Sequence, residues 1–456
     1  MMTFTLGQIA QATGGRLIGD PDTVISGLTT DSRAAGGQDL FIALKGSRFD
    51  GHDFVEELRA RVGAVVTERE FAVPPYDIVV PDTYKALGAI GKLCRQQANI
   101  RISVGITGSV GKTTTKELVA SVLKEKYKTH YSKGNFNNHI GLPLTLSQLE
   151  RDTEALVCEM GMSNAGEIAY LSGLSTPDVA IVTNIGVSHI ENLGTRENIR
   201  NAKLEILQGM KKGSTVILDG DEPLLRDSVA REMLKDYKVI YSGFDIGNDI
   251  YPLDIFKGSN YIAFDAISPQ GEMRITIPAV GDHFVKNALF AYAAGIVCGV
   301  SFEGIARGIA AYLPEQLRQK IYMKNGIRVI ADCYNASPES MSAALNVLGG
   351  CSERKIAVLG DMLELGLMSE AAHRAVGIKA SENSDYLICY GSQARLIMRS
   401  AIENGYDPQK AMFFDDIEAL SKKLKEILKK DDCVLFKASR RMKLERAITL
   451  SALDGE

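Results

Sequence analysis

Residues 106–114 read Ile106-Thr107-Gly108-Ser109-Val110-Gly111-Lys112-Thr113-Thr114, a glycine-containing turn that follows an apolar run and leads into a helical pattern. Glycines let backbone N–H groups turn toward phosphate oxygens, and a helix N-terminus adds partial positive charge. A lysine in this place reaches the outer phosphates, and a threonine hydroxyl is a ligand for Mg²⁺. The pattern T-G-x-x-G-K-T differs from the general P-loop at its first glycine, where Ile106 stands. It predicts a nucleotide phosphate site, the alternative being a plain glycine turn.

Strands and helices alternate around this loop in the order β, α, β, which is typical of a parallel, doubly wound sheet. Between about residues 240 and 282 the apolar period changes to two, which predicts antiparallel strands added to that sheet. Between residues 100 and 313 we expect strands at 102–107, 155–159, 179–184 and 214–218, and helices at 114–126, 196–210, 285–298 and 302–311.

Two further blocks flank the central one. Residues 1–99 predict short strands at 40–44 and 63–67 with helices at 53–61 and 83–98. Residues 314–456 again alternate, with strands at 327–332, 355–359, 386–389 and 432–436, after a turn at 313–315. In this last block, Ser337-Pro338-Glu339 predicts a helix start, because serine caps a helix and proline fits its first position. The sequence therefore predicts an α/β protein of three domains, at 1–99, 100–313 and 314–456.

Composition limits the possible partners. Of 456 residues, 45% are hydrophobic, and 52 Lys and Arg against 56 Asp and Glu give a formal charge of -4. The sequence has no excess of basic residues, so neither nucleic acid nor an anionic membrane is favoured as a partner. No apolar run reaches the length of a membrane span. The start lacks the pattern of a secretory signal, and the seven scattered cysteines form no C-x-x-C. We expect a cytoplasmic protein without disulfides or zinc.

Polar residues follow two expected strands of the central block. Glu159 ends the strand 155–159 and precedes a glycine, and carboxylate oxygens suit Mg²⁺ beside a nucleotide. His189 lies shortly after the strand 179–184, at the sheet edge where ligands bind in open α/β sheets. The alternatives are a surface glutamate and a structural histidine.

Two loops hold clustered polar side chains. In the first, Asn135, Asn137 and Asn138 occupy three of four positions, so they either grip a carboxylate and an amide or make turns. In the second, Asp332 to Asn335 follow a strand and precede the Ser337 helix start, so they either reach a nucleotide or cap the helix. The residues alone leave both pairs of alternatives open.

Taken together, these segments resemble the Mur ligase family. The resemblance covers all three blocks and rests on residues 107–115, 134–145, 159–168, 183–189, 202–206, 332–336, 358–366 and 436–440. Two departures stand out: Phe284 replaces a usual Asn, and Pro314 to Arg318 stand where many members have Pro-Gly-Arg. The family has a small UDP-sugar domain, a central P-loop ATPase domain and a C-terminal Rossmann-like domain.

The resemblance implies a ligase that uses ATP and Mg²⁺. Tyr334-Asn335 and the segment G-D-M-L-E-L-G at 360–366 point to the member whose substrates are UDP-N-acetylmuramoyl-tripeptide and D-alanyl-D-alanine. The tripeptide carboxylate would take the γ-phosphate of ATP, and the dipeptide amine would attack the resulting acyl phosphate. A monomer is expected.

The resemblance also assigns roles to residues. It implies catalytic roles for Lys112, Glu159, His189 and Lys203, with Thr113, Glu159, His189 and Lys203 at the metal. ATP would be bound by Gly108 to Thr114 with Asn287, Arg318, Asp332 and Asn335. Substrate would be bound by Ser32, Arg33, Lys45, Gly46, Asp50, His52, Asn137 and Asn138.

Other functions fit some of the same residues. The rivals are a sister Mur ligase, a folylpolyglutamate-type amide ligase, and a P-loop regulatory NTPase. The first block disfavours the folylpolyglutamate type, which has no comparable domain before its P-loop. The chain has no N-K-x-D motif, which disfavours a guanine-nucleotide switch.

The side-chain amine of Lys203 is expected to be neutral. In a helix over 196–210 it would share a face with Ile199, Ile206, Leu207 and Met210, where desolvation favours its neutral amine. A neutral amine reacts with CO₂, and the carbamate would be an oxygen ligand for a second Mg²⁺. The resemblance adds that residues 202–206 match the family segment that bears this modification. The alternative is a lysine whose stem crosses apolar surface toward solvent.

Overall fold

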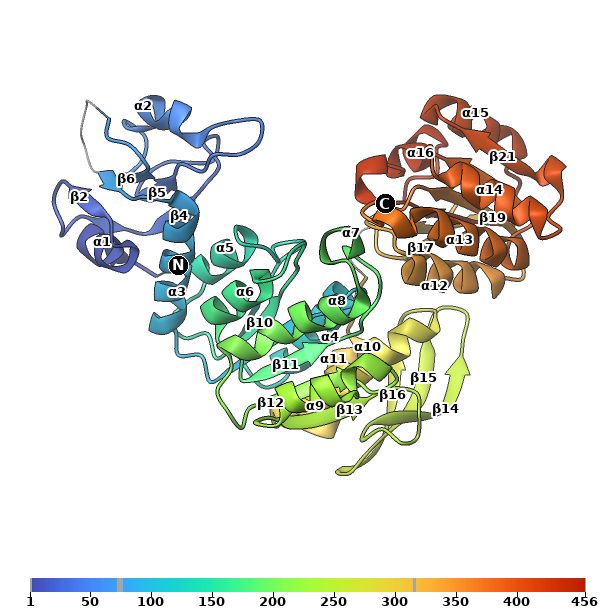
Figure 1. Cartoon of the computed structure of the whole chain (residues 1–456), viewed down its shortest axis with the longest axis horizontal. Helices are drawn as coiled ribbons and strands as arrows, with labels where there is room; N and C mark the ends of the chain where they lie inside the picture. Colours follow the sequence, from blue (N-terminus) through green and yellow to red (C-terminus); the bar gives the residue numbers. More distant parts are fainter. Residues whose placement is uncertain (1, 72–76, 315–316, 456) are drawn as a thin grey trace.

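We describe a computed structural model of the chain, covering residues 2–71, 77–314 and 317–455. Figure 1 shows three parts in chain order, each with its own sheet: an N-terminal part in blue, a central part in green and yellow, and a C-terminal part in orange and red. The predicted turn at 313–315 includes Glu315, and the predicted boundary at 314 directly precedes it; Glu315 and Gln316 lie outside the described residues.

The N-terminal part holds a five-stranded sheet in the order β2-β7-β6-β5-β4. Its apolar strands bury Leu40, Ile42, Val66 and Ile78 beneath α1 (Leu6–Thr13) and α3 (Thr83–Gln97). The expected helix at 53–61 is shorter, because Asp50 caps a 3₁₀ turn over Gly51–Phe54 before the single turn α2 (Val55–Leu58). The strands are β2 (Arg16–Ile18), β4 (Gly27–Thr29), β5 (Asp39–Ile42), β6 (Ala64–Thr67) and β7 (Asp77–Val79), and β1 (Phe4–Thr5) pairs separately with β3 (Val24–Ile25).

The central part is built on six parallel strands in the order β13-β12-β11-β8-β10-β9. Their side chains alternate between two buried faces: in β10, Leu156 belongs to the core that includes residues of α6 and α8, while Val157 belongs to the core that includes residues of α4 and α10. Burial on both faces explains the nearly continuous apolar runs. The predicted doubly wound sheet is confirmed. The strands are β8 (Ile102–Thr107), β9 (Thr129–Tyr131), β10 (Ala155–Glu159), β11 (Val179–Val182), β12 (Thr215–Asp219) and β13 (Lys238–Ser242), and the helices are α4 (Lys112–Lys124), α5 (Gly141–Ser147), α6 (Glu167–Ser175), α7 (Ile190–Leu193), α8 (Arg196–Leu204), α9 (Ser228–Leu234), α10 (Asp282–Val297) and α11 (Phe302–Ala310).

Two predictions for the central part are wrong in detail. The period-two segment forms a separate antiparallel sheet of β14 (Tyr251–Lys257), β15 (Ile262–Ser268) and β16 (Gly271–Ile277), because its apolar face packs against α10 and α11. The helix expected over 196–210 ends at Leu204 and tightens into a 3₁₀ turn, Glu205–Gly209. There Gly209 approaches α6 so closely that a Cβ would lie 2.2 Å from the carbonyl oxygen of Ser172.

The C-terminal part holds six strands in the order β17-β18-β22-β19-β20-β21, all parallel except β17. Helices cover both faces, so this part is also an α/β layer structure. Ser337 caps α12 (Pro338–Gly349) in a capping box with Ser340, as its sequence predicts. The strands are β17 (Lys320–Lys324), β18 (Ile327–Asp332), β19 (Arg354–Gly360), β20 (Tyr386–Tyr390), β21 (Ala411–Phe414) and β22 (Asp432–Lys437), and the other helices are α13 (Ser369–Asn383), α14 (Ala394–Glu403), α15 (Ile417–Ile427) and α16 (Glu445–Leu450).

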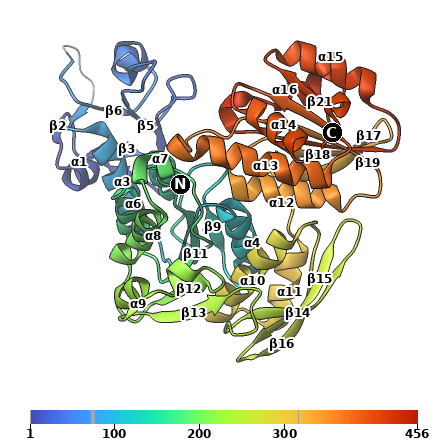
Figure 2. The same ribbon diagram turned by 45° about the vertical axis from the view of Figure 1, so that its right-hand side comes forward.

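The central and C-terminal parts face one another across α12. Figures 1 and 2 both show α12 on the side of the C-terminal part that is turned toward the central part. Within the described ranges, no helix has the length and apolar character needed to cross a membrane.

Candidate active site

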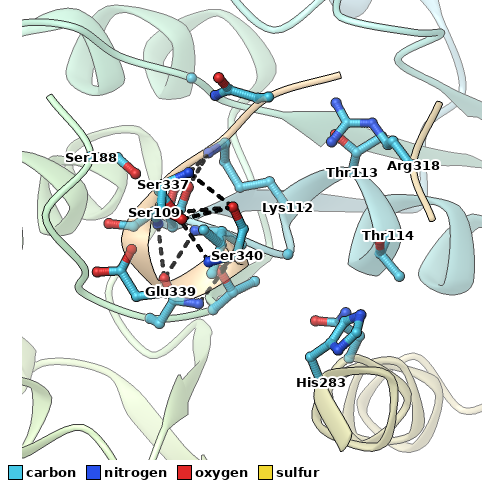
Figure 3. Close-up of a pocket in the computed structure, with 18 of the residues that line it drawn as sticks. Ser109, Lys112, Thr113, Thr114, Ser188, His283, Arg318, Ser337, Glu339 and Ser340 are labelled. Carbon is cyan, nitrogen blue, oxygen red and sulfur yellow. Dashed lines mark hydrogen bonds between the residues drawn. The ribbon is translucent and has the colours of Figure 1, made fainter. Parts of the chain in front are cut away.

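A cavity of about 630 Å³ lies between the central and C-terminal parts (Figure 3). Its walls come from the turn before α4, from the ends of β10 and β11, from α10, and from the start of α12. The structure brings most of the predicted site residues to this one cavity: Gly108, Ser109, Val110, Gly111, Lys112, Thr113, Thr114, Asn137, Asn138, Glu159, His189, Lys203, Asn287, Arg318, Asp332 and Asn335.

The glycine turn is held by the end of the neighbouring strand β11. The Asn184 side-chain oxygen accepts the backbone N–H groups of Ser109 at 3.1 Å and Val110 at 3.0 Å. Gly108 has a φ of +149°, and a Cβ there would lie 1.8 Å from the Thr183 hydroxyl, so only glycine fits. The sequence analysis did not predict that Thr183 and Asn184 hold the glycine turn in place. Their position directly after an apolar strand was the signal that could have shown it.

Lys112 begins α4 and folds over the turn. Its Nζ donates to the carbonyl oxygens of Gly108 at 2.7 Å and Ser109 at 3.1 Å. Burial lowers the pKa of Lys112, the negative charge of Glu159 opposes that shift, and Arg318 adds to it. The ammonium is thus placed beside the N-terminus of a helix, where both groups attract anions.

Glu159 joins the turn to the Asn-rich loop. The Thr113 hydroxyl donates to its Oε2 at 2.8 Å, and the Asn137 amide donates to its Oε1 at 2.8 Å. The carboxylate is buried, with 1% of the residue exposed. Oxygen donors of this kind suit Mg²⁺, which usually takes one or two protein carboxylates and completes its shell with water and phosphate. In the described part of the chain, no three or more His, Cys, Asp or Glu side chains form a group that could hold a metal ion.

His189 and Lys203 enter the cavity from the segment after β11 and from α8. The His189 Nδ1 lies 2.8 Å from Oε2 of Glu364 in the C-terminal part, and burial lowers the pKa of the imidazole. Lys203 is 1% exposed, as its position on an apolar face predicted, although the helix is shorter than expected. Burial lowers the pKa of Lys203 well below its usual range, and the positive charge of Lys112 lowers it further. That shift favours a neutral amine.

Basic and aromatic side chains of the C-terminal part also line the cavity. The Arg318 guanidinium lies 3.7 Å from the Tyr334 ring centroid, and Lys437 at the end of β22 donates to Asp332 at 2.5 Å. Asn287 is buried on α10, where its Oδ1 accepts the Thr115 hydroxyl at 3.2 Å. Sequence reasoning missed several residues of the wall as site residues, among them Phe244, Lys286, Glu339 and Lys437. For Lys437, a basic residue that ends an apolar strand was the signal.

The predicted substrate residues of the N-terminal part lie outside this cavity. Asp50 accepts the His52 backbone N–H at 3.0 Å and lies 2.6 Å from Nδ1, while the His52 Nε2 accepts the Glu68 N–H at 2.9 Å. Arg33 pairs with Asp31 at 2.7 Å. The residues outside the cavity are Ser32, Arg33, Lys45, Gly46, Asp50 and His52, and a binding role for them stays a prediction.

Comparison with known families and proteins covers most of the chain. The Mur ligase middle domain matches residues 106–295, the Mur ligase glutamate ligase domain matches 317–440, and the Mur ligase family catalytic domain matches 24–87. The chain is 40% identical to the UDP-N-acetylmuramoyl-tripeptide--D-alanyl-D-alanine ligase of Bacillus subtilis (strain 168), over 98% of each chain.

Two solved structures share the fold over nearly the whole chain. A crystal structure of MurF from Acinetobacter baumannii is 32% identical, with a TM-score of 0.90 over 100% of both chains. The MurF ligase of Thermotoga maritima in complex with ADP is 29% identical, with a TM-score of 0.83 over 93% of this chain and 96% of that one. These matches agree with the site geometry, and the protein belongs to the Mur ligase family.

Proposed function

We propose that this protein is the ATP-dependent ligase that joins D-alanyl-D-alanine to UDP-N-acetylmuramoyl-tripeptide in peptidoglycan precursor synthesis. The near full-length similarity to ligases of that name carries the proposal, and the cavity between the central and C-terminal parts supports it. A sister Mur ligase would need a different amine substrate, and a regulatory NTPase would not need one.

The chain's own residues divide the work at the phosphates. The backbone N–H groups of Gly111 and of the first turn of α4, with Lys112, bind the β- and γ-phosphates and offset their charge. Thr113, Glu159 and His189 would hold Mg²⁺, and a carbamate on Lys203 would help to hold a second ion. When bound, Mg²⁺ supplies positive charge at the transferring phosphoryl group.

Asn287, Arg318, Asp332 and Asn335 surround the rest of the nucleotide in this proposal. Asn137 and Asn138 hold the tripeptide end that accepts the phosphoryl group. In the acyl phosphate, the leaving group on the carbonyl carbon is phosphate, which leaves more easily than a carboxylate oxygen. The dipeptide amine attacks this carbonyl and phosphate is released. The protein acts mainly by positioning these groups and stabilising charge.

The domain assignment is part of the same proposal. Residues 1–99 would bind the UDP-sugar through Ser32, Arg33, Lys45, Gly46, Asp50 and His52. Residues 100–313 would bind ATP, and residues 314–456 would close over it. The protein would act as a monomer on small-molecule substrates.

Phosphate release tests the proposal directly. With the UDP-tripeptide, ATP and Mg²⁺ present, rapid release should require D-alanyl-D-alanine. A regulatory NTPase would release phosphate slowly and equally without either cosubstrate. A sister ligase would respond to a single amino acid instead of the dipeptide.

A further inference from the structure

Cys351 and Cys433 bring two thiols into contact in the C-terminal part. The Cys433 Sγ donates to the Cys351 Sγ across 3.2 Å, although 82 positions separate the two residues in the chain. Cys433 is the second residue of β22, and Cys351 lies in the connection between α12 and β19. The fold therefore pairs two thiols whose spacing in the sequence shows no motif.

The two thiols differ in their exposure to solvent. Cys433 is 0% exposed and belongs to an apolar core of the C-terminal part, whereas Cys351 is only partly buried and packs at the edge of that core. The other five cysteines of the chain are buried as well. Cys351 is therefore the cysteine that a small reagent in solution reaches most readily.

The charges around the pair favour ionisation of the more exposed thiol. In the sheet register, Cys433 lies between Arg328 of β18 and Lys355 of β19. The hydrogen bond from Cys433 lowers the pKa of Cys351. The positive charges of Arg328 and Lys355 act in the same direction, while burial and the charge of Glu353 oppose them. The same hydrogen bond, together with burial, raises the pKa of Cys433. Of the two thiols, Cys351 loses its proton more readily, and the thiolate is the reactive form.

We propose that Cys351 and Cys433 form a reversible oxidation site, at which a peroxide converts the two thiols into a disulfide. The Cys351 thiolate attacks one oxygen of hydrogen peroxide and the O–O bond breaks. Cys351 becomes a sulfenic acid, and the departing hydroxide takes up a proton to form water. The Cys433 sulfur then attacks the Cys351 sulfur, so an S–S bond forms and the S–O bond breaks. The sulfenic oxygen leaves with the Cys433 proton as a second water, and the two sulfurs have together given two electrons to the peroxide.

The fold needs little movement for this step. A disulfide bond is about 2.05 Å long, so the sulfurs approach one another by about 1 Å from their 3.2 Å contact. The bond would join the end of α12 to the start of β22. The opposite ends of these two elements reach the cavity, where Glu339 and Lys437 line its wall. Oxidation would thus crosslink two elements that carry cavity residues, and this proposal does not depend on the proposed function.

Mass spectrometry of the full chain tests the site. The reduced protein is treated with hydrogen peroxide and then denatured in excess N-ethylmaleimide, which blocks every remaining thiol. The untreated chain should carry seven adducts, one for each cysteine, and the treated chain two fewer. Peptide mapping should show the peptides of Cys351 and Cys433 linked to each other, and dithiothreitol should restore all seven adducts.

Variants then separate the roles of the two thiols. Cys433→Ala should leave Cys351 as a sulfenic acid that dimedone labels, because the second thiol is missing. Cys351→Ala should keep Cys433 reduced at the same peroxide concentration, because Cys433 is buried. The matched control is Cys389→Ala, which changes a buried cysteine of β20 in the same core and should still form the linked pair.

The decisive result comes from the wild-type chain, so it does not depend on the folding of any variant. Peroxide-treated wild type without the linked pair would overturn the proposal. A disulfide to a different cysteine, or to a second copy of the chain, would overturn it as well.

Discussion

The Thr113 hydroxyl donates a hydrogen bond of 2.8 Å to Oε2 of Glu159. This bond joins the first turn of α4, which follows β8, to the end of the neighbouring strand β10. Parallel strands end at the same sheet edge, so a residue after β8 and the last residue of β10 meet there. The pair places a hydroxyl and a carboxylate oxygen together at the proposed Mg²⁺ position.

Glu159→Gln should therefore weaken the binding of the Mg²⁺ that ligation needs. Removing the carboxylate charge should raise the Mg²⁺ concentration for half-maximal rate by about tenfold or more. Glu154→Gln is the control, because Glu154 precedes the same strand at its other end and pairs with Arg101. Identical Mg²⁺ titrations for Glu159→Gln and wild type would refute this assignment.

Lys112→Ala should abolish most ATP-dependent ligation while the melting profile stays unchanged. Its ammonium donates to two carbonyl oxygens of the turn, so the loss falls on phosphate stabilisation, worth roughly 10²–10³ in rate. Lys124→Ala, an exposed change in the last turn of the same helix, should keep normal turnover. Near-normal turnover of Lys112→Ala would show that the phosphate assignment is wrong.

Lys203 should carry a carbamate. Its buried, neutral amine can react with CO₂, and the product is an anion suited to Mg²⁺. Lys203→Ala should lose most activity, and added short-chain carboxylates should restore part of it by occupying the vacated anion position. Lys212→Ala changes an exposed lysine paired with Asp236 and should remain fully active. Full activity of Lys203→Ala in buffer depleted of CO₂ would end this account.

His283 should make the protein less stable in mild acid. Burial lowers the pKa of His283 from 6.5 to about 4, with Asp332 opposing the shift. Below pH 6.5 the unfolded chain binds a proton that the folded chain does not, so the free energy of unfolding falls as the pH falls toward 4.

The expected loss is about 2 kcal/mol between pH 7 and pH 5. His283→Gln should show a smaller drop in urea midpoint over that interval, because glutamine does not titrate. Equal drops in the two proteins would contradict a neutral His283 in the folded chain.

The sequence predicted the central sheet and most of the cavity because both depend on local patterns. Apolar strands that end in a turn, an acid or a histidine place those side chains at one sheet edge, so Lys112, Glu159 and His189 could be grouped in advance. The Ser337-Pro338 helix start was likewise readable, since its cap lies within four residues.

What the sequence did not reveal depends on contacts between distant segments. The turn at Glu205–Gly209 follows from the approach of Gly209 to α6, and the pairing of His189 with Glu364 joins residues from two domains. The separate sheet of β14 to β16 arises because its apolar face packs on α10 and α11. No local sequence pattern indicates which distant segments come into contact.

Product mass spectrometry tests the central claim most directly. The protein is incubated with UDP-N-acetylmuramoyl-tripeptide, ATP, Mg²⁺ and D-alanyl-D-alanine, and each component is omitted in turn. The account predicts a UDP-N-acetylmuramoyl-pentapeptide, with one ADP and one phosphate for each product molecule, only in the complete mixture. Stoichiometric ADP release without that pentapeptide, or a product that contains a single added amino acid, would contradict it.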